Sequence, residues 1–186
     1  MRPLLLLDVD GPLHPWAATA QGRPPGFVEH RYRLSRWRRA TASVWLNPAH
    51  GAALLALADV TGAELVWATS WGDRANVVIG PAIGLPRLPV IDFAGSLADS
   101  GPDWKFRAVA RHCYGRPLAW LDDDFELRPQ AREAFLIKRK FNAAPTLLAS
   151  VDPRTGLTDA DLDAVLAWLQ ALSAGQKPDS DQGLCP

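Results

Sequence analysis

Four consecutive leucines, residues 4–7, are followed at once by two carboxylates, Asp8 and Asp10. An unbroken apolar run of this kind is typical of a strand buried on both faces, as in the middle of a parallel sheet. Ligands of open α/β sheets bind at the carboxyl ends of such strands, and Gly11 and Pro12 suit a sharp turn there. Because burying an unpaired carboxylate is costly, the stretch favours a ligand site over the alternative, an ordinary strand end with two acids.

The chain as a whole is typical of one globular domain. Its 186 residues are enough for a full core, and 48% of them are hydrophobic. The formal net charge is zero, so bulk electrostatics indicate neither a nucleic-acid nor a membrane partner. The two cysteines, Cys113 and Cys185, form no disulfide framework and no zinc spacing. We expect no signal peptide, no membrane span and a cytoplasmic location.

Apolar segments with strand character alternate with helical segments along the chain. The strands are expected near residues 4–7, 63–68, 88–93, 118–121 and 146–150. The helices are expected near residues 48–59, 72–80, 103–113, 126–141 and 158–172. This alternation predicts an α/β fold, a Rossmann-like three-layer sandwich with a five-stranded parallel sheet. The domain is expected to span residues 1–174, and the polar segment 175–186 to be a disordered tail.

The segment at about residues 14–45 is predicted to be a small cap inserted after the first strand. It holds Gly and Pro residues and then a strongly basic run with interleaved aromatic residues: His30, Arg31, Tyr32, Arg33, Arg36, Trp37, Arg38 and Arg39. Partial alternation over 27–37 indicates an edge strand or a hairpin. Arginine suits phosphate recognition, so the run is either an anion-binding surface, with Arg31 and Arg33 as candidates, or a solvated basic face.

Three of the predicted strands end in side chains that can bind a metal ion or take part in a reaction. These are Asp8 and Asp10, Thr69 and Ser70, and Asp122, Asp123 and Asp124. Parallel strands bring such ends to one edge of the sheet, where several carboxylates would repel each other unless a cation lies among them. Because the side chains offer only oxygen, with no His or Cys, the set favours Mg²⁺ over zinc.

This set of side chains can carry out phosphoryl chemistry. Magnesium usually takes one or two protein carboxylates and leaves room for a phosphate, so another Asp is free to attack phosphorus as a nucleophile. A neighbouring carboxyl group can act as general acid and base. Thr69 and Lys105 can stabilise the non-bridging oxygens. A surface role for Lys105 is disfavoured by its position in the first turn of a predicted helix, where the dipole opposes a cation.

Four segments together resemble the motifs of the haloacid dehalogenase-like (HAD) superfamily of phosphohydrolases. They are 8–13, which reads Asp-Val-Asp-Gly-Pro-Leu, then Thr69, Lys105 and 122–123. Pro12 departs from the family pattern, where Thr or Val is commoner, but it is compatible with the turn.

The resemblance implies that Asp8 is the nucleophile and Asp10 the general acid and base. It further implies Mg²⁺ held by Asp8, the main-chain carbonyl of Asp10, and Asp123, with Asp122 nearby. A Mg²⁺-dependent phosphatase with an aspartyl-phosphate intermediate is therefore expected.

A narrower resemblance is to the HAD branch named for Swiss Army Knife RNA-repair proteins. It rests on residues 66–71, on Asp73, Ala75 and Asn76, and on residues 84–86, 88–90, 152–153 and 156–158, and it implies a substrate that is a nucleotide or a nucleic-acid end. Substrate contacts are then expected from Ser70 as well as from the two arginines of the basic run. Two alternatives remain: a catalytically idle domain that binds a nucleotide or RNA end, and a phosphotransferase. The chain has neither GxxxxGK[ST] nor GxGxxG after the first strand, which excludes a P-loop and a dinucleotide fingerprint.

Overall fold

The structure is a computed structural model, and it describes residues 1–19, 22–34, 40–93 and 103–175. Some sequence-based expectations lie outside these ranges, namely those for Arg36, Trp37, Arg38 and Arg39 and for the tail beyond residue 175.

The centre of the fold is a parallel sheet of four strands in the order β4-β1-β5-β6. Its strands are β1 (Leu4–Leu7), β4 (Glu64–Trp67), β5 (Leu118–Asp122) and β6 (Thr146–Ser150). Both neighbours of β1 pair with it in register along its whole length. The first strand is therefore central, as the leucine run predicts.

The prediction of a fifth strand at 88–93 is wrong. This segment makes only an isolated parallel bridge, between Val90 and Trp67. Around that bridge the Trp67 N–H donates to the Pro89 carbonyl, and the Ile91 N–H donates to the Trp67 carbonyl, both at 2.9 Å. Extending the ladder by one step would require an N–H at position 89, which proline lacks.

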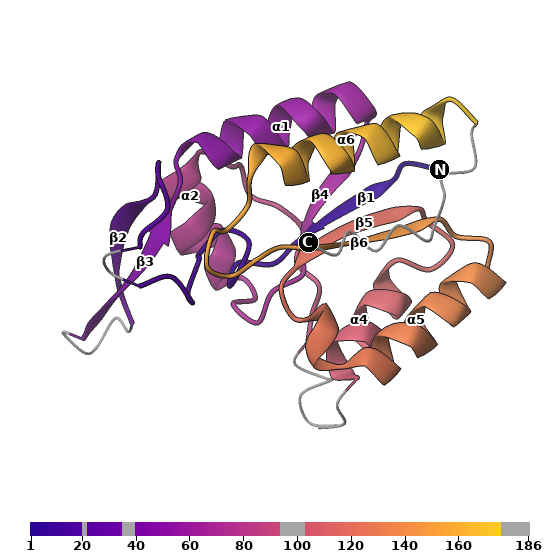
Figure 1. Ribbon diagram of the computed structural model, residues 1–186, viewed down its shortest axis with the longest axis horizontal. Coiled ribbons are helices and arrows are strands. Elements are labelled where there is room, and N and C mark those ends of the chain that lie inside the picture. The colour runs from indigo at the N-terminus through magenta and orange to yellow at the C-terminus, as the bar shows by residue number, and fades with distance from the viewer. Residues whose placement is uncertain (20–21, 35–39, 94–102, 176–186) are drawn as a thin grey trace.

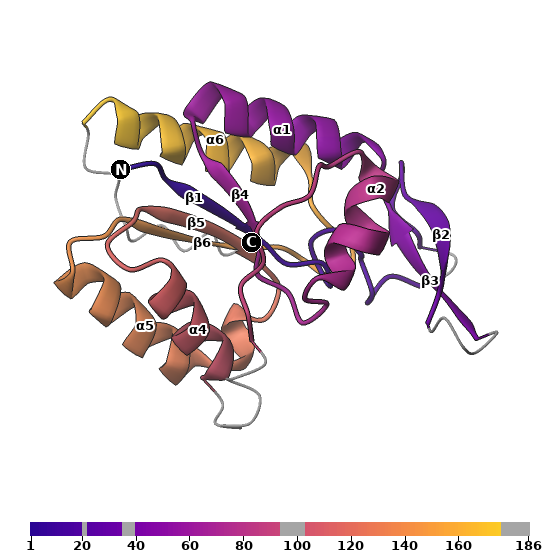
Figure 2. The same ribbon diagram turned by 180° about the vertical axis from the view of Figure 1, so that it is seen from behind.

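Helices cover both faces of the sheet, which confirms the three layers (Figures 1 and 2). The helices α1 (Ala49–Thr61) and α6 (Asp159–Ser173) lie on one face, and α4 (Trp104–His112) and α5 (Pro129–Phe141) lie on the other. Successive leucines of β1 alternate between the two resulting cores. Leu5 and Leu7 belong to the core under α1 and α6, and Leu4 and Leu6 to the core under α4 and α5. This two-sided burial explains why four apolar residues stand in a row.

Local signals account for some of the helix ends. The capping box of Thr158 and Asp161 is present at the start of α6. A short 3-10 helix, Phe125–Leu127, precedes the break at Pro129. The helix expected to end near residue 80 continues instead, as a π-helix (Ala75–Ile79) followed by α2 (Gly80–Ile83). It continues because Pro81 lies in the first turn of α2, where its missing N–H is tolerated.

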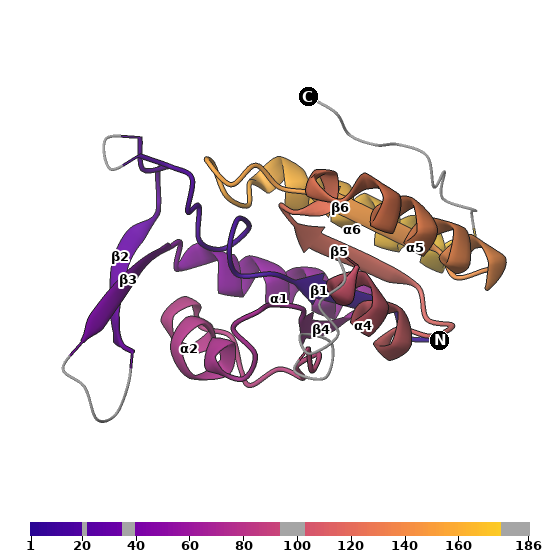
Figure 3. The ribbon, with the colours of Figure 1, turned by 90° about the horizontal axis from the view of Figure 1, so that it is seen from below.

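The insertion after β1 contains an antiparallel hairpin of β2 (Val28–Arg33) and β3 (Thr41–Leu46). It stands outside the main sheet and projects from the end of the molecule at which β1 runs out (Figure 3). Within the described residues, no helix has the length and apolar character needed to cross a membrane.

Candidate active site

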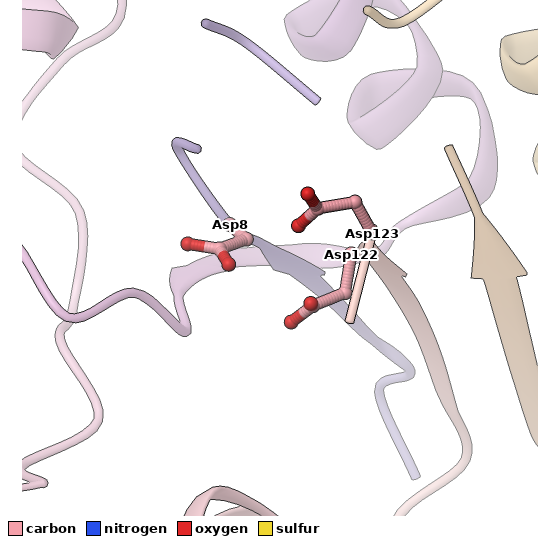
Figure 4. A group of neighbouring side chains, drawn as sticks. All are labelled: Asp8, Asp122 and Asp123. Carbon is pink, nitrogen blue, oxygen red and sulfur yellow. The ribbon is translucent and has the colours of Figure 1, made fainter. Parts of the chain in front are cut away.

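The carboxyl ends of adjacent strands bring three acidic side chains together. Asp8 follows β1, Asp122 is the last residue of β5, and Asp123 follows it. One carboxylate oxygen from each lies within 4.8 Å of the others, and Figure 4 shows the three side chains gathered at the ends of the two strands. The structure therefore joins two acidic segments that lie more than a hundred residues apart.

Lys105, from the first turn of α4, enters this cluster. Its Nζ lies 2.6 Å from Asp8 Oδ2 and 2.5 Å from Asp122 Oδ2. The other oxygens accept main-chain hydrogen bonds, Asp8 Oδ1 from the Val9 N–H at 2.7 Å and Asp122 Oδ1 from the Asp124 N–H at 3.0 Å. Burial alone would lower the pKa of Lys105, but the two carboxylates outweigh it and raise that pKa. The lysine is thus held as a cation.

The acidic cluster carries more negative charge than Lys105 can balance. Burial, followed by the charge of Asp8, raises the pKa of Asp122. Burial also raises the pKa of Asp123 to about 6, and the charges of Asp124 and Asp8 act in the same direction. Carboxylates crowded in this way favour a cation, and an all-oxygen set suits Mg²⁺. The residues present therefore fit the metal that the sequence predicts.

The turn after β1 packs directly on Asp123. Gly11 has a φ of +85°, and a Cβ at this position would lie 2.4 Å from Asp123 Cγ. Trp16, farther along the same loop, donates from Nε1 to Asp123 Oδ2 at 2.9 Å. Both the conformation and the close approach require glycine here. The loop thereby fixes the orientation of one of the three acids.

The Asp10 carboxylate points to a different neighbour. Its Oδ2 accepts a hydrogen bond from Trp71 Nε1 at 3.0 Å, and Asp10 is not among the three clustered acids. Burial raises the pKa of Asp10, and the Trp71 hydrogen bond partly opposes that rise. A partly buried carboxyl group with a raised pKa is suited to carrying a proton.

The loop after β4 supplies further polar groups. Thr69 is fully buried, and its Oγ1 accepts from the Trp71 N–H at 3.3 Å. Ser70, the next residue, is exposed. The hydrogen bonds that Trp16 and Trp71 donate were not predicted from the sequence, because their acceptors lie 107 and 61 residues away and no local spacing identifies such pairs.

Arg31 and Arg33 lie on the exposed cap hairpin. Arg31 pairs with Glu29 at 3.2 Å, while Tyr32, between the two arginines, contacts the Trp71 ring with centroids 5.3 Å apart. Side chains alternate along a strand, so the two arginines occupy the hairpin face opposite to Tyr32.

A family model for the HAD domain in Swiss Army Knife RNA repair proteins matches residues 4–162. The chain belongs to this family. The matched range contains the polar residues that follow three of the strands, together with Lys105. These residues are Asp8 and Asp10, Thr69 and Ser70, and Asp122, Asp123 and Asp124. The resemblance predicted from the motifs is therefore confirmed. Comparisons with curated proteins and with solved structures find no match. Membership in the HAD family supports a phosphohydrolase class of activity, and the cluster of three Asp is compatible with a divalent metal.

Proposed function

We propose that this protein is a Mg²⁺-dependent phosphomonoester hydrolase that works through an aspartyl-phosphate on Asp8. The observation that carries the proposal is the cluster of Asp8, Asp122 and Asp123, whose oxygens lie within 4.8 Å of one another, with the Lys105 ammonium against two of them. A nucleophile, a cation site and a fixed positive charge thus lie within reach of one phosphate group.

Asp8, Asp123 and the main-chain carbonyl of Asp10 would hold the metal, with Asp122 beside them. When bound, Mg²⁺ offsets the charge that develops on the phosphoryl oxygens. Lys105 bridges Asp8 and Asp122, orients the Asp8 carboxylate and adds a second positive charge on the helix α4 side. The Thr69 hydroxyl can donate a hydrogen bond to a phosphoryl oxygen.

The first step transfers the phosphoryl group to the protein. A carboxylate oxygen of Asp8 forms a bond to phosphorus while the bond from phosphorus to the ester oxygen breaks. Asp10 gives its proton to the departing oxygen, which leaves as an alcohol. The raised pKa of Asp10 keeps that proton available closer to neutral pH than an exposed carboxyl group would.

The second step releases phosphate. Asp10, now a carboxylate, takes a proton from a water molecule, and the water oxygen attacks phosphorus. The bond between phosphorus and the Asp8 oxygen breaks, which returns Asp8 to its starting form and yields inorganic phosphate. The same residue therefore serves first as acid and then as base.

The family match favours a substrate that is a nucleotide or a nucleic-acid end. Ser70 is exposed beside buried Thr69, which makes it a candidate contact to the substrate. Arg31 and Arg33 are further candidates, for the parts of a polymer that extend beyond the cap hairpin.

The test is turnover of p-nitrophenyl phosphate with Mg²⁺, with EDTA, and with Asp8→Asn in the presence of Mg²⁺. We expect hydrolysis by the unmodified protein with Mg²⁺ and loss of at least 100-fold in the other two cases, by analogy with the loss of other catalytic groups (~10² or more). Hydrolysis that survives both changes would rule out the metal and the nucleophile. Absence of hydrolysis with every phosphomonoester tried would favour the idle binding domain, and phosphate transferred to an added alcohol would favour a phosphotransferase.

A further inference from the structure

Arg74 lies over an aromatic pair beside the candidate general acid. Its Cζ is 5.5 Å from the centroid of the Tyr32 ring and 5.6 Å from that of the Trp71 ring. The two rings contact each other with centroids 5.3 Å apart. Tyr32 comes from the cap hairpin, whereas Trp71 and Arg74 come from the loop after β4. The guanidinium is therefore held by cation–π contacts from two separate segments.

The charge of Arg74 is not neutralised by the surroundings that the structure describes. Two other surface arginines are paired, Arg87 with Asp73 at 2.7 Å and Arg31 with Glu29 at 3.2 Å. Arg74 is exposed, and within the described ranges it forms no ion pair. A guanidinium that is supported on aromatic rings keeps its N–H edges available for an anion.

Arg74 lies on the Asp10 side of the candidate active site. Trp71 donates to Asp10 Oδ2 at 3.0 Å through the same indole that Arg74 covers. The Trp71 indole therefore contacts both the guanidinium and Asp10. In the proposed reaction Asp10 protonates the ester oxygen, so the leaving group lies on this side of the phosphate. Any further group that the leaving alcohol of the substrate carries therefore lies towards Arg74.

We propose that Arg74 binds a second phosphate group of the substrate, the phosphodiester that follows the terminal phosphomonoester in a nucleic-acid end. The inference rests on the proposed function, and it names a substrate class within it: the end of a strand is preferred to a lone nucleotide. It also gives the cap hairpin a role that differs from the one expected from Arg31 and Arg33, because Tyr32 supports the residue that contacts the substrate.

The experiment compares substrates that share one phosphomonoester and differ in the second phosphate. Thymidine mononucleotides phosphorylated at the 5′ or 3′ position are compared with the matching phosphorylated dithymidine dinucleotides, and the nucleoside diphosphate is included as another source of a second phosphate. For the unmodified protein we expect a higher kcat/KM with a dinucleotide than with its mononucleotide. For Arg74→Ala we expect kcat/KM to fall about 10-fold or more with that dinucleotide, the range for loss of a charged hydrogen bond, and less than about 2-fold with the mononucleotide.

Two matched variants separate the anion contact from general effects. Arg87→Ala removes an exposed positive charge beside Asp73, the residue that precedes Arg74. We expect it to leave the ratio of kcat/KM for the dinucleotide to kcat/KM for the mononucleotide unchanged. Arg74→Lys keeps the charge but loses the fork, so we expect a partial loss with the dinucleotide. A preference for the diphosphate that equals the preference for the dinucleotide would support the anion site and assign it to any adjacent phosphate.

Binding is measured as well as turnover. Titration of Asp8→Asn with a dinucleotide, followed by tryptophan fluorescence in EDTA, should give a dissociation constant that rises when Arg74→Ala is added. This binding measurement tests the Arg74 contact even if the unmodified protein hydrolyses none of the substrates. Absence of hydrolysis would contradict the proposed function but not the Arg74 contact. The inference is overturned if Arg74→Ala has the same effect with both substrate lengths, or if it alters neither turnover nor binding.

Discussion

The ammonium of Lys105 lies 2.6 Å from a carboxylate oxygen of Asp8. The same nitrogen contacts Asp122 at 2.5 Å, so one side chain of α4 joins the ends of two neighbouring strands. Only 12% of the Lys105 side chain is exposed, and the two acids are more deeply buried. The stability of this edge of the sheet therefore depends on keeping the three charges together.

Replacing Lys105 by Met should destabilise the metal-free protein by roughly 3 kcal/mol at pH 7, because it leaves buried carboxylates without their cation. The loss should be smaller at pH 5 than at pH 9, because the pKa of Asp122 is raised to about 8 and a protonated Asp122 does not need the cation. Urea unfolding at these pH values measures both effects. Arg107→Ala is the matched control: its ion pair with Asp103 is exposed on the same helix and should be worth less than about 1 kcal/mol. Equal losses for the two variants would contradict this account.

The sheet could be predicted from the sequence wherever apolar runs stand free of proline. The four leucines of β1, and the apolar runs of β4, β5 and β6, all form strands in the expected parallel sheet. The segment at 88–93 has comparable apolar content but fails because Pro89 cannot donate to the ladder. A backbone N–H, rather than hydrophobicity, decides that case.

The side chains around the candidate site were harder to predict than its acids. Asp8, Asp122 and Asp123 follow strands that become neighbours, so topology alone brings them together. Trp71 reaches Asp10 across 61 residues, and nothing in its local sequence indicates the pairing. For the hairpin, alternation shows that Tyr32 faces away from Arg31 and Arg33, but only tertiary packing decides which face meets the domain.

Stabilisation by Mg²⁺ should appear as the pH rises through about 6. The pKa of Asp123 is raised from 3.8 to about 6, so between these values the folded metal-free protein keeps a proton that the unfolded chain has lost. Stability without metal therefore falls as the pH rises through this window. Because Mg²⁺ requires the carboxylate, the increase in melting temperature on adding Mg²⁺ should be small at pH 5 and large at pH 7.5. Asp123→Asn should show little increase at either pH, and a shift with Mg²⁺ that is independent of pH would refute the assignment.

Gly11→Ala should weaken both folding and metal binding. The substitution strains a backbone with φ of +85° and places a Cβ 2.4 Å from Asp123 Cγ. Gly62→Ala is a close control, since that residue also has positive φ, +68°, but nothing lies within 4 Å of the added Cβ. We expect a loss of about 1–2 kcal/mol from backbone strain at Gly62, and a larger loss at Gly11 together with a weaker response to Mg²⁺. Thermal or urea unfolding of both variants with and without Mg²⁺ tests this, and a Gly11→Ala protein no worse than the control would argue against the close contact.

Arg31→Ala and Arg33→Ala should raise KM for phosphorylated polymers more than for small esters, if the basic face of the hairpin contacts a long substrate. Their exposed position makes each contact electrostatic and therefore sensitive to salt. The measurement is KM for a phosphorylated oligonucleotide and for p-nitrophenyl phosphate at two ionic strengths. The same change in KM for both substrates would leave no reason to assign a substrate contact to this face.

Trp71→Phe should impair the protonation of poor leaving groups. The change keeps an aromatic ring in contact with Tyr32 and Arg74 but removes the N–H that donates to Asp10 Oδ2 at 3.0 Å. A general acid matters most when the departing alkoxide is a strong base, so we expect kcat with an alkyl phosphate to fall about 10-fold or more and kcat with p-nitrophenyl phosphate to fall much less. Trp16→Phe removes an indole donor in the same way, but from Asp123, and should instead raise the Mg²⁺ concentration needed for half-maximal activity. If the two variants had the same effect on both leaving groups and on Mg²⁺, the two tryptophans would have no separate roles and Trp71 would not position Asp10.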